Sequence, residues 1–240
     1  MGRREEYREA LSGLSGEALD EFLESRSGLP GPRANLELAG AVADVADAAT
    51  AWRLAGSDRE YTRLCGVVAL GEVAGRTSDD ALRARVVARL RAEADDERWR
   101  IREAVAVALQ RIGDADPGLL REVVRDWLAE HDPLVVRAAL AGVCEPRLLR
   151  DPQTAALALD ACDRATDRLD RLSPAVRRNP QVRVMRQALG YCWSVAVAAD
   201  PAQGLARFAR LAASSDPDVL WVERENRRKT RLQRLLDPAS

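Results

Sequence analysis

Two stretches of the chain place a tryptophan one helical turn before a glutamate. Trp99 precedes Glu103, and Trp221 precedes Glu225. Residues four apart lie on the same face of an α-helix, so the indole and the carboxylate of each pair should face the same way. A flat ring beside a carboxylate forms a shelf on which a ligand can lie. Both places are therefore candidate binding sites.

The first pair lies on a helix whose two faces differ. Its apolar positions converge on one side at 100° per residue; they are Ile101, Ala104, Val105, Ala108 and Ile112. The opposite stripe consists of Trp99, Glu103, Ala106 and Gln110. If this helix is the inner one of its hairpin, that stripe faces a partner, and Trp99, Glu103 and Gln110 are expected to contact it. The structural alternative is that Trp99 packs between neighbouring repeats while Glu103 is a solvated acid.

The second pair lies in the most basic part of the chain. Glu225 and Arg228 are three residues apart and can pair across one turn of the C-terminal helix, whose apolar stripe is predicted to continue from Trp221 to Leu232 and Leu235. We interpret Trp221, Glu225 and Arg228 as partner contacts. The candidates for phosphate contacts are Arg177, Arg178, Arg224, Arg227, Lys229 and Arg231, to which Arg183 and Arg186 can add. The alternative is a terminal capping helix that is charged for solubility.

The elements that carry these residues are predicted to be helices throughout. Ala-rich composition and the absence of alternating patterns exclude strands. Ser, Thr and Asp-Pro signals favour helix starts, because the side chain accepts bonds from the first free amides and Pro fits the first turn. We expect helices at 16–25, 80–95, 118–130 and 153–172, one long Ala-rich helix after the turn at 27–32, a break at 173–180, and helices after Asp200 and Asp216.

Parts of the sequence repeat. Residues 97–105 recur 35 residues later as 132–140, and residues 69–75 echo 108–114 at a spacing of 39. Periods in this range are typical of stacked helical hairpins. We therefore predict an all-α fold, a right-handed α-solenoid of about five or six repeats. It would form one domain, 1–240, with a capping hairpin at 1–30, the clearest repeats at 57–145 and capping helices at 200–234.

The repeated segments resemble the second helix of HEAT repeats, a family of ARM-like α-solenoids. They share an acidic residue or Asp-Pro at the turn and a following Val/Ile-Arg-x-x-Ala pattern. In that family the turn acid and the helix arginine of successive units often pair as a ladder. The resemblance implies that Arg102 and Arg137 are ladder arginines, with Asp96 or Glu97 and Asp132 as their partners.

The chain also resembles bacterial HEAT-repeat proteins of similar length that lack an established activity. More distantly, it is similar to the DNA alkylation repair glycosylases, short HEAT-like solenoids that bind DNA along a concave face. Those enzymes hold a cationic damaged base with an aromatic residue and a carboxylate, and Trp99 with Glu103 is the nearest match. The resemblance implies that Glu103 would stabilise positive charge on the sugar or orient the attacking water.

Composition excludes several classes of function. The net charge is −1, so no global field draws the protein to DNA or to an anionic membrane. His131 is the single histidine, and Cys65, Cys144, Cys162 and Cys192 form no CxxC pair, so we expect buried thiols, no metal and no cofactor. We also expect no membrane span and no leader segment, and a cytoplasmic location.

The favoured hypothesis is a non-catalytic scaffold that binds a macromolecular partner, a protein, on a concave face. The alternative is a DNA-binding protein that resembles the alkylpurine glycosylases and uses Trp99 and Glu103 on the damaged base. The two hypotheses differ in what they require of Trp99. The glycosylase alternative needs open space above its indole and arginines beside it.

Overall fold

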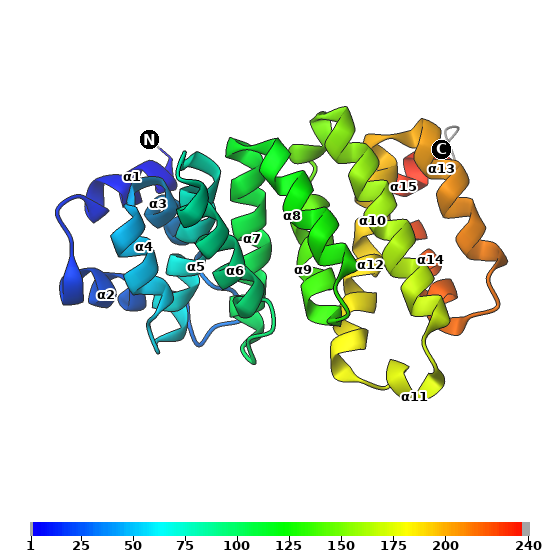
Figure 1. Cartoon of the computed structure of the whole chain (residues 1–240), viewed down its shortest axis with the longest axis horizontal. Coiled ribbons are helices and arrows are strands. Elements are labelled where there is room, and N and C mark those ends of the chain that lie inside the picture. The colour runs from blue at the N-terminus through cyan, green and yellow to red at the C-terminus, as the bar shows by residue number, and fades with distance from the viewer. Residues whose placement is uncertain (1, 237–240) are drawn as a thin grey trace. The chain divides into compact units, whose positions relative to one another are not determined.

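The computed structural model describes residues 2–236, and within that range the chain is all-α, without a strand (Figure 1). This confirms the predicted fold class. The chain divides into two compact units, Met1–Asp116 and Pro117–Ser240, which are described separately below. The single domain inferred over 1–240 stays a prediction, and its ends, Met1 and 237–240, lie outside the described residues.

The first unit is built around its fifth helix. Its helices are α1 (Arg3–Leu11), α2 (Gly16–Ser25), α3 (Leu36–Val45), α4 (Ala48–Ala55), α5 (Glu60–Arg76), α6 (Asp80–Glu93) and α7 (Trp99–Ala115). Helices α3 and α7 both pack against α5, and α4 and α6 contact it as well. Helix α5 is consequently buried along most of its length, which explains its run of Val, Ala, Leu, Gly and Cys.

The second unit has α12 at its centre. Its helices are α8 (Pro117–Ala129), α9 (Pro133–Val143), the short 3₁₀ helix η1 (Leu148–Arg150), α10 (Pro152–Arg171), α11 (Pro174–Arg177), α12 (Pro180–Ala199), α13 (Pro201–Ala209), η2 (Arg210–Ala213), α14 (Pro217–Arg227) and α15 (Thr230–Leu236). Helix α12 packs against α9, α10, α13 and α14. Both units thus show helices of neighbouring hairpins stacked in a layer, as helical repeats require.

The predicted helix starts are confirmed, and the capping chemistry explains them. Asp151 accepts a hydrogen bond from the Thr154 amide, and Asp200 accepts one from the Gln203 amide. Asp216 accepts from the amides of Asp218 and Val219, each at 3.0 Å. In all three cases proline follows at the first helical position, where its missing N–H leaves no bond unmade.

Two predicted boundaries are wrong. The long Ala-rich helix is two helices, α3 and α4, because the Asp47 side chain accepts from the Thr50 amide at 2.8 Å and starts a new helix. The last helix breaks at Arg228 and Lys229, so the stripe from Trp221 to Leu235 is not continuous. The predicted break at 173–180 is present between α10 and α12, and it contains the four-residue helix α11.

Small residues bring α5 and α7 into close contact. A Cβ added at Gly71 would lie 2.3 Å from the backbone oxygen of Ala108, so only glycine permits this approach. The apolar face predicted for α7 is confirmed, since Ile101, Val105 and Ile112 are fully buried. The tight packing on α5 therefore fixes α7, and with it the helix turn that carries Trp99.

All four cysteines are free thiols and buried, as predicted. Burial raises the pKa of the Cys162 thiol. The side chains of Cys162 and Cys192 both lie within hydrogen-bonding contact of Cys144, a cluster that their wide separation in the sequence does not predict. Among residues 2–236, no helix is both long and apolar enough to cross a membrane.

Candidate functional site

The first turn of α7 opens onto a cavity of about 640 Å³ in the first unit. Trp99 is 50% exposed, so its side chain is not buried between repeats. Glu103 lies one turn further along the same wall. The cavity is lined by Arg3, Pro32, Arg33, Ala34, Asn35, Leu36, Glu37, Leu64, Trp99, Arg100 and Glu103. The structure thus places the predicted aromatic and carboxylate together, with arginines beside them.

Arg100 links α7 to the loop at Gly31 and to the start of α5. Its Nη2 donates to the backbone oxygen of Gly31 at 2.9 Å, and its Nη1 lies 3.4 Å from Oε2 of Glu60. The guanidinium also sits 4.6 Å from the centroid of the Trp99 ring, within the range of a cation–π contact. This contact holds one side of the indole and leaves the ring half-exposed to the cavity.

The opposite wall is held by Asn35. Its Oδ1 accepts from the Leu38 amide at 3.1 Å and so starts α3, while its Nδ2 donates to the Tyr7 hydroxyl. The buried Tyr61 hydroxyl donates to the Asn35 backbone oxygen at 2.6 Å, and burial raises the pKa of Tyr61. With Leu64 buried at the base, this wall is built from satisfied polar groups and packed apolar ones.

The turn before α7 is fixed by Asp96. Its carboxylate accepts hydrogen bonds from Arg98 Nε at 2.9 Å and Nη2 at 2.8 Å, and from the Arg98 amide. Arg63 Nη2 lies 3.2 Å from the same carboxylate. The bond from the Arg98 side chain, partly offset by burial, lowers the pKa of Asp96 to about 2. Asp96 is therefore ionised at neutral pH and anchors the start of the helix.

Two arginines contact the turn that contains Asp96, and the ladder implied for Arg102 stays a prediction. Arg63 pairs with both Asp96 and Glu93, whereas Arg102 donates to the backbone oxygens of Asp96 and Glu97. Arg63 precedes Arg102 by 39 residues, the spacing of the echo between 69–75 and 108–114, which is the sequence signal that points to it.

The remaining residues that the sequence singled out on α7 and α9 differ in how far they are buried. Gln110 and Glu103 are half-buried, while Ala106 is only 2% exposed, so the exposed stripe of α7 is shorter than predicted. Asp132 caps α9 by accepting from the Leu134 amide at 2.8 Å. Arg137 lies half-buried on α9.

The second Trp-Glu pair is packed differently. A Cβ added at Gly190 would lie 2.9 Å from the Trp221 ring, so the indole rests on the α12 backbone. The Arg186 guanidinium lies 4.4 Å from the ring centroid. Glu225 accepts from Arg228 Nη1 at 2.7 Å, the pairing that their spacing predicts. Indole and carboxylate are thus both engaged within the second unit.

The basic residues predicted for phosphate contact fall into two groups. Near the C-terminus, Arg227 pairs with Glu223 at 2.7 Å and Arg231 donates to the Tyr191 hydroxyl at 3.0 Å. Arg224 is exposed and Lys229 is half-buried. The other group, Arg177 and Arg178, lines a separate cavity together with Arg183 and Arg186.

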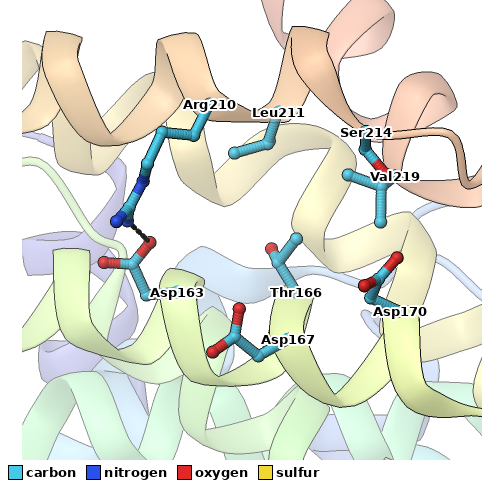
Figure 2. Close-up of a pocket in the computed structure, with 8 residues that line it drawn as sticks. All are labelled: Asp163, Thr166, Asp167, Asp170, Arg210, Leu211, Ser214 and Val219. Carbon is cyan, nitrogen blue, oxygen red and sulfur yellow. Dashed lines mark hydrogen bonds and ion pairs between the residues drawn. The ribbon is translucent and has the colours of Figure 1, made fainter.

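A further cavity of the second unit, of about 450 Å³, is acidic (Figure 2). Asp163, Asp167 and Asp170 project from α10, and Arg210 reaches Asp163 at 2.9 Å from the facing segment. Asp163 also accepts from Arg207, yet burial, its dominant influence, keeps its pKa above the ordinary value. This cavity is lined by Asp163, Thr166, Asp167, Asp170, Arg210, Leu211, Ser214 and Val219.

In the part of the chain that the structure describes, no group of three or more His, Cys, Asp or Glu side chains is arranged to hold a metal ion. His131 is exposed in the short turn between α8 and α9.

Comparison with known proteins gives one family match. A family model described as DNA alkylation repair enzyme matches residues 37–144, which include Trp99 and Glu103. No curated protein matches the chain. A designed armadillo repeat protein is 13% identical, with 92% of this chain and 97% of that chain covered and a TM-score of 0.40. An engineered protein from a structural genomics consortium is 16% identical, with 99% and 98% covered and a TM-score of 0.38.

Proposed function

We propose that the protein binds DNA that contains an N-alkylated, positively charged purine and hydrolyses the bond between that base and its sugar. The observation that carries this proposal is the half-exposed Trp99 beside Glu103 in an open cavity. The match of residues 37–144 to the DNA alkylation repair family supports it, because that segment contains both residues.

The cavity offers the interactions that such a base needs. A cationic purine stacks on an indole both through its apolar faces and through the attraction of its charge to the ring. Glu103 supplies a negative charge on the same side. Arg3 and Arg33 line the cavity and are suited to phosphate groups that flank the base. The protein's near-neutral total charge is then no obstacle, because the positive charge is local.

The chemistry is a hydrolysis that the alkylated base already favours. When the C1′–N bond breaks, the cationic purine leaves as a neutral base and positive charge grows on the sugar. A carboxylate close to that sugar stabilises the developing charge, and it can accept the proton of the water whose hydroxyl joins C1′. We assign both roles to Glu103.

The test uses duplex DNA with one N7-methylguanine and measures both the release of free base and binding by fluorescence anisotropy. Glu103→Gln should slow release by roughly 100-fold, the typical effect of removing one preorganised electrostatic group. Trp99→Ala should weaken binding to the modified duplex by about ten-fold, as expected for one lost stacking contact.

Glu225→Gln is the matched control, because Glu225 also follows a tryptophan by four residues but lies in the second unit and does not line the Trp99 cavity. Its release rate should equal that of the unaltered protein. Absence of base release by the unaltered protein, together with equal affinity for modified and unmodified duplexes, would contradict the proposal. Modified-DNA binding that depends on Trp99 without base release would instead support a non-catalytic reader of damage.

The non-catalytic scaffold for a protein partner stays a prediction of the sequence. It is favoured over DNA if the unaltered protein shows no salt-dependent retention of any duplex, because phosphate contacts always weaken as salt rises.

A further inference from the structure

Four arginines meet around a second, smaller cavity in the second unit. The cavity has a volume of about 290 Å³ and is lined by Arg177, Arg178, Val182, Arg183, Arg186 and Asp218. Arg177 ends the short helix α11, Arg178 follows it, and Arg183 and Arg186 lie in the first two turns of α12. The turn between α11 and α12 therefore gathers these side chains.

Two of the four arginines are held in place by the protein itself. Arg177 Nε donates to the Leu172 backbone oxygen at 2.7 Å, and its Nη1 pairs with Asp216. Arg186 Nη1 pairs with Asp218, and its guanidinium lies against the Trp221 ring. Both side chains are thus held by groups at the start of α14 and, for Arg177, by the turn before α11.

The guanidinium groups of the other two arginines have N–H donors that no group of the protein accepts from in the described part of the chain. Arg178 and Arg183 are exposed, and neither makes an ion pair or side-chain hydrogen bond within residues 2–236. Arg186 adds a buried Nε that has no hydrogen-bond partner in this part of the chain. A buried donor without a partner is unfavourable, and native structures usually satisfy such groups with a ligand, ion or water.

The charges around the cavity do not balance. Four guanidinium groups face two carboxylates, Asp216 and Asp218, so the local excess is two positive charges. Guanidinium groups this close repel one another, and an anion between them removes that repulsion. The excess suits a phosphate group better than a carboxylate, because a phosphate presents more acceptor oxygens and can meet more of these guanidinium groups at once.

We propose that this arginine pocket binds a phosphate group. The planar fork of each guanidinium matches two phosphate oxygens, and four forks from different directions suit a tetrahedral anion. The phosphate can belong to a nucleic-acid backbone or be free. The inference does not rest on the proposed function, because the arginine pocket lies wholly in the second unit and contains neither Trp99 nor Glu103.

The test compares two double variants of the full chain. Arg178→Ala with Arg183→Ala removes the two unpaired arginines, and Arg125→Ala with Arg164→Ala removes two exposed arginines of the same unit for the same change in charge. Binding of inorganic phosphate is measured by calorimetry and binding of an unmodified duplex by anisotropy. Circular dichroism and the melting temperature without ligand show that both variants fold.

The first double variant should lose at least about ten-fold in affinity, and the control should change by less than about two-fold, because only the first loses charge-assisted bonds to the anion. Loss with inorganic phosphate identifies free phosphate as sufficient, whereas loss with the duplex alone identifies the backbone as the source. Acetate should not displace inorganic phosphate. Equal affinities of both variants for both ligands would overturn the inference, even if Trp99-dependent binding of modified DNA is found.

Discussion

The two tryptophans that precede a glutamate by four residues share this spacing but lie in different environments. Trp99 lies half-exposed above a cavity, with Glu103 in the same wall. Trp221 rests on Gly190 of a neighbouring helix, and its Glu225 is paired with Arg228. An arginine lies over each ring, at 4.6 Å and 4.4 Å. The comparison shows that spacing puts an indole and a carboxylate together, while the neighbouring helix decides whether a ligand can reach them.

The largest expected effect comes from removing Trp221, the tryptophan that packs on Gly190. Trp221→Ala should lower the free energy of unfolding by about 3 kcal/mol, because it empties the space between Gly190 and Arg186. Trp99→Ala should cost no more than about 1 kcal/mol, since half of its indole is already exposed to water. Urea denaturation of both variants measures the difference. Equal losses would mean that Trp99 is also a packing residue.

An intermediate effect is expected for Asp96, which fixes the turn before α7 and so the position of Trp99. Asp96→Asn should lower the free energy of unfolding at pH 7 by about 2 kcal/mol, because the carboxylate loses its charge-assisted bonds to Arg98 and Arg63. The pKa of Asp96 is about 2 in the folded protein, below its ordinary value of about 4 in the unfolded chain. Its stabilisation is therefore complete above about pH 4 and is lost as the pH falls toward 2.

Urea denaturation of the Asp96→Asn variant and the unaltered protein, repeated across this pH range, checks that sign. The gap between them should close as the pH falls. A gap that is constant with pH would show that the charge of Asp96 contributes nothing.

The smallest effect is expected from breaking the ion pair between Glu225 and Arg228. Arg228→Ala should change the free energy of unfolding by less than about 0.5 kcal/mol, because the Glu225–Arg228 pair is exposed to solvent. Thermal melting at low and high salt measures it. A larger, salt-sensitive loss would show that this pair holds the end of α14.

Local chemistry made the helices predictable. Asp151, Asp200 and Asp216 each carry the cap and the following proline in adjacent residues, so no tertiary information is needed to place those starts. The break at Asp47 follows the same capping rule, but the Ala-rich stretch around it also satisfies a continuous helix. The break at Arg228 and Lys229 has no Gly or Pro to signal it.

The candidate site was predictable only in part. The pairing of Trp99 with Glu103 follows from helix geometry, but the opposite wall comes from Gly31 to Glu37, about 70 residues earlier in the chain. No periodicity links those residues to α7. The same limit explains Gly190 beneath Trp221, since that contact joins two helices whose register only tertiary packing determines.

Each of the two units contains at least one buried cysteine, whose reaction with a thiol probe can report the opening of that unit. Cys65 is sealed inside the first unit, while Cys144, Cys162 and Cys192 are sealed inside the second. A maleimide probe can react only after the surrounding helices open, so the rate at which each cysteine becomes labelled follows the opening of its own unit. Mass spectrometry of labelled peptides would then tell whether the two halves of the molecule open together or in turn.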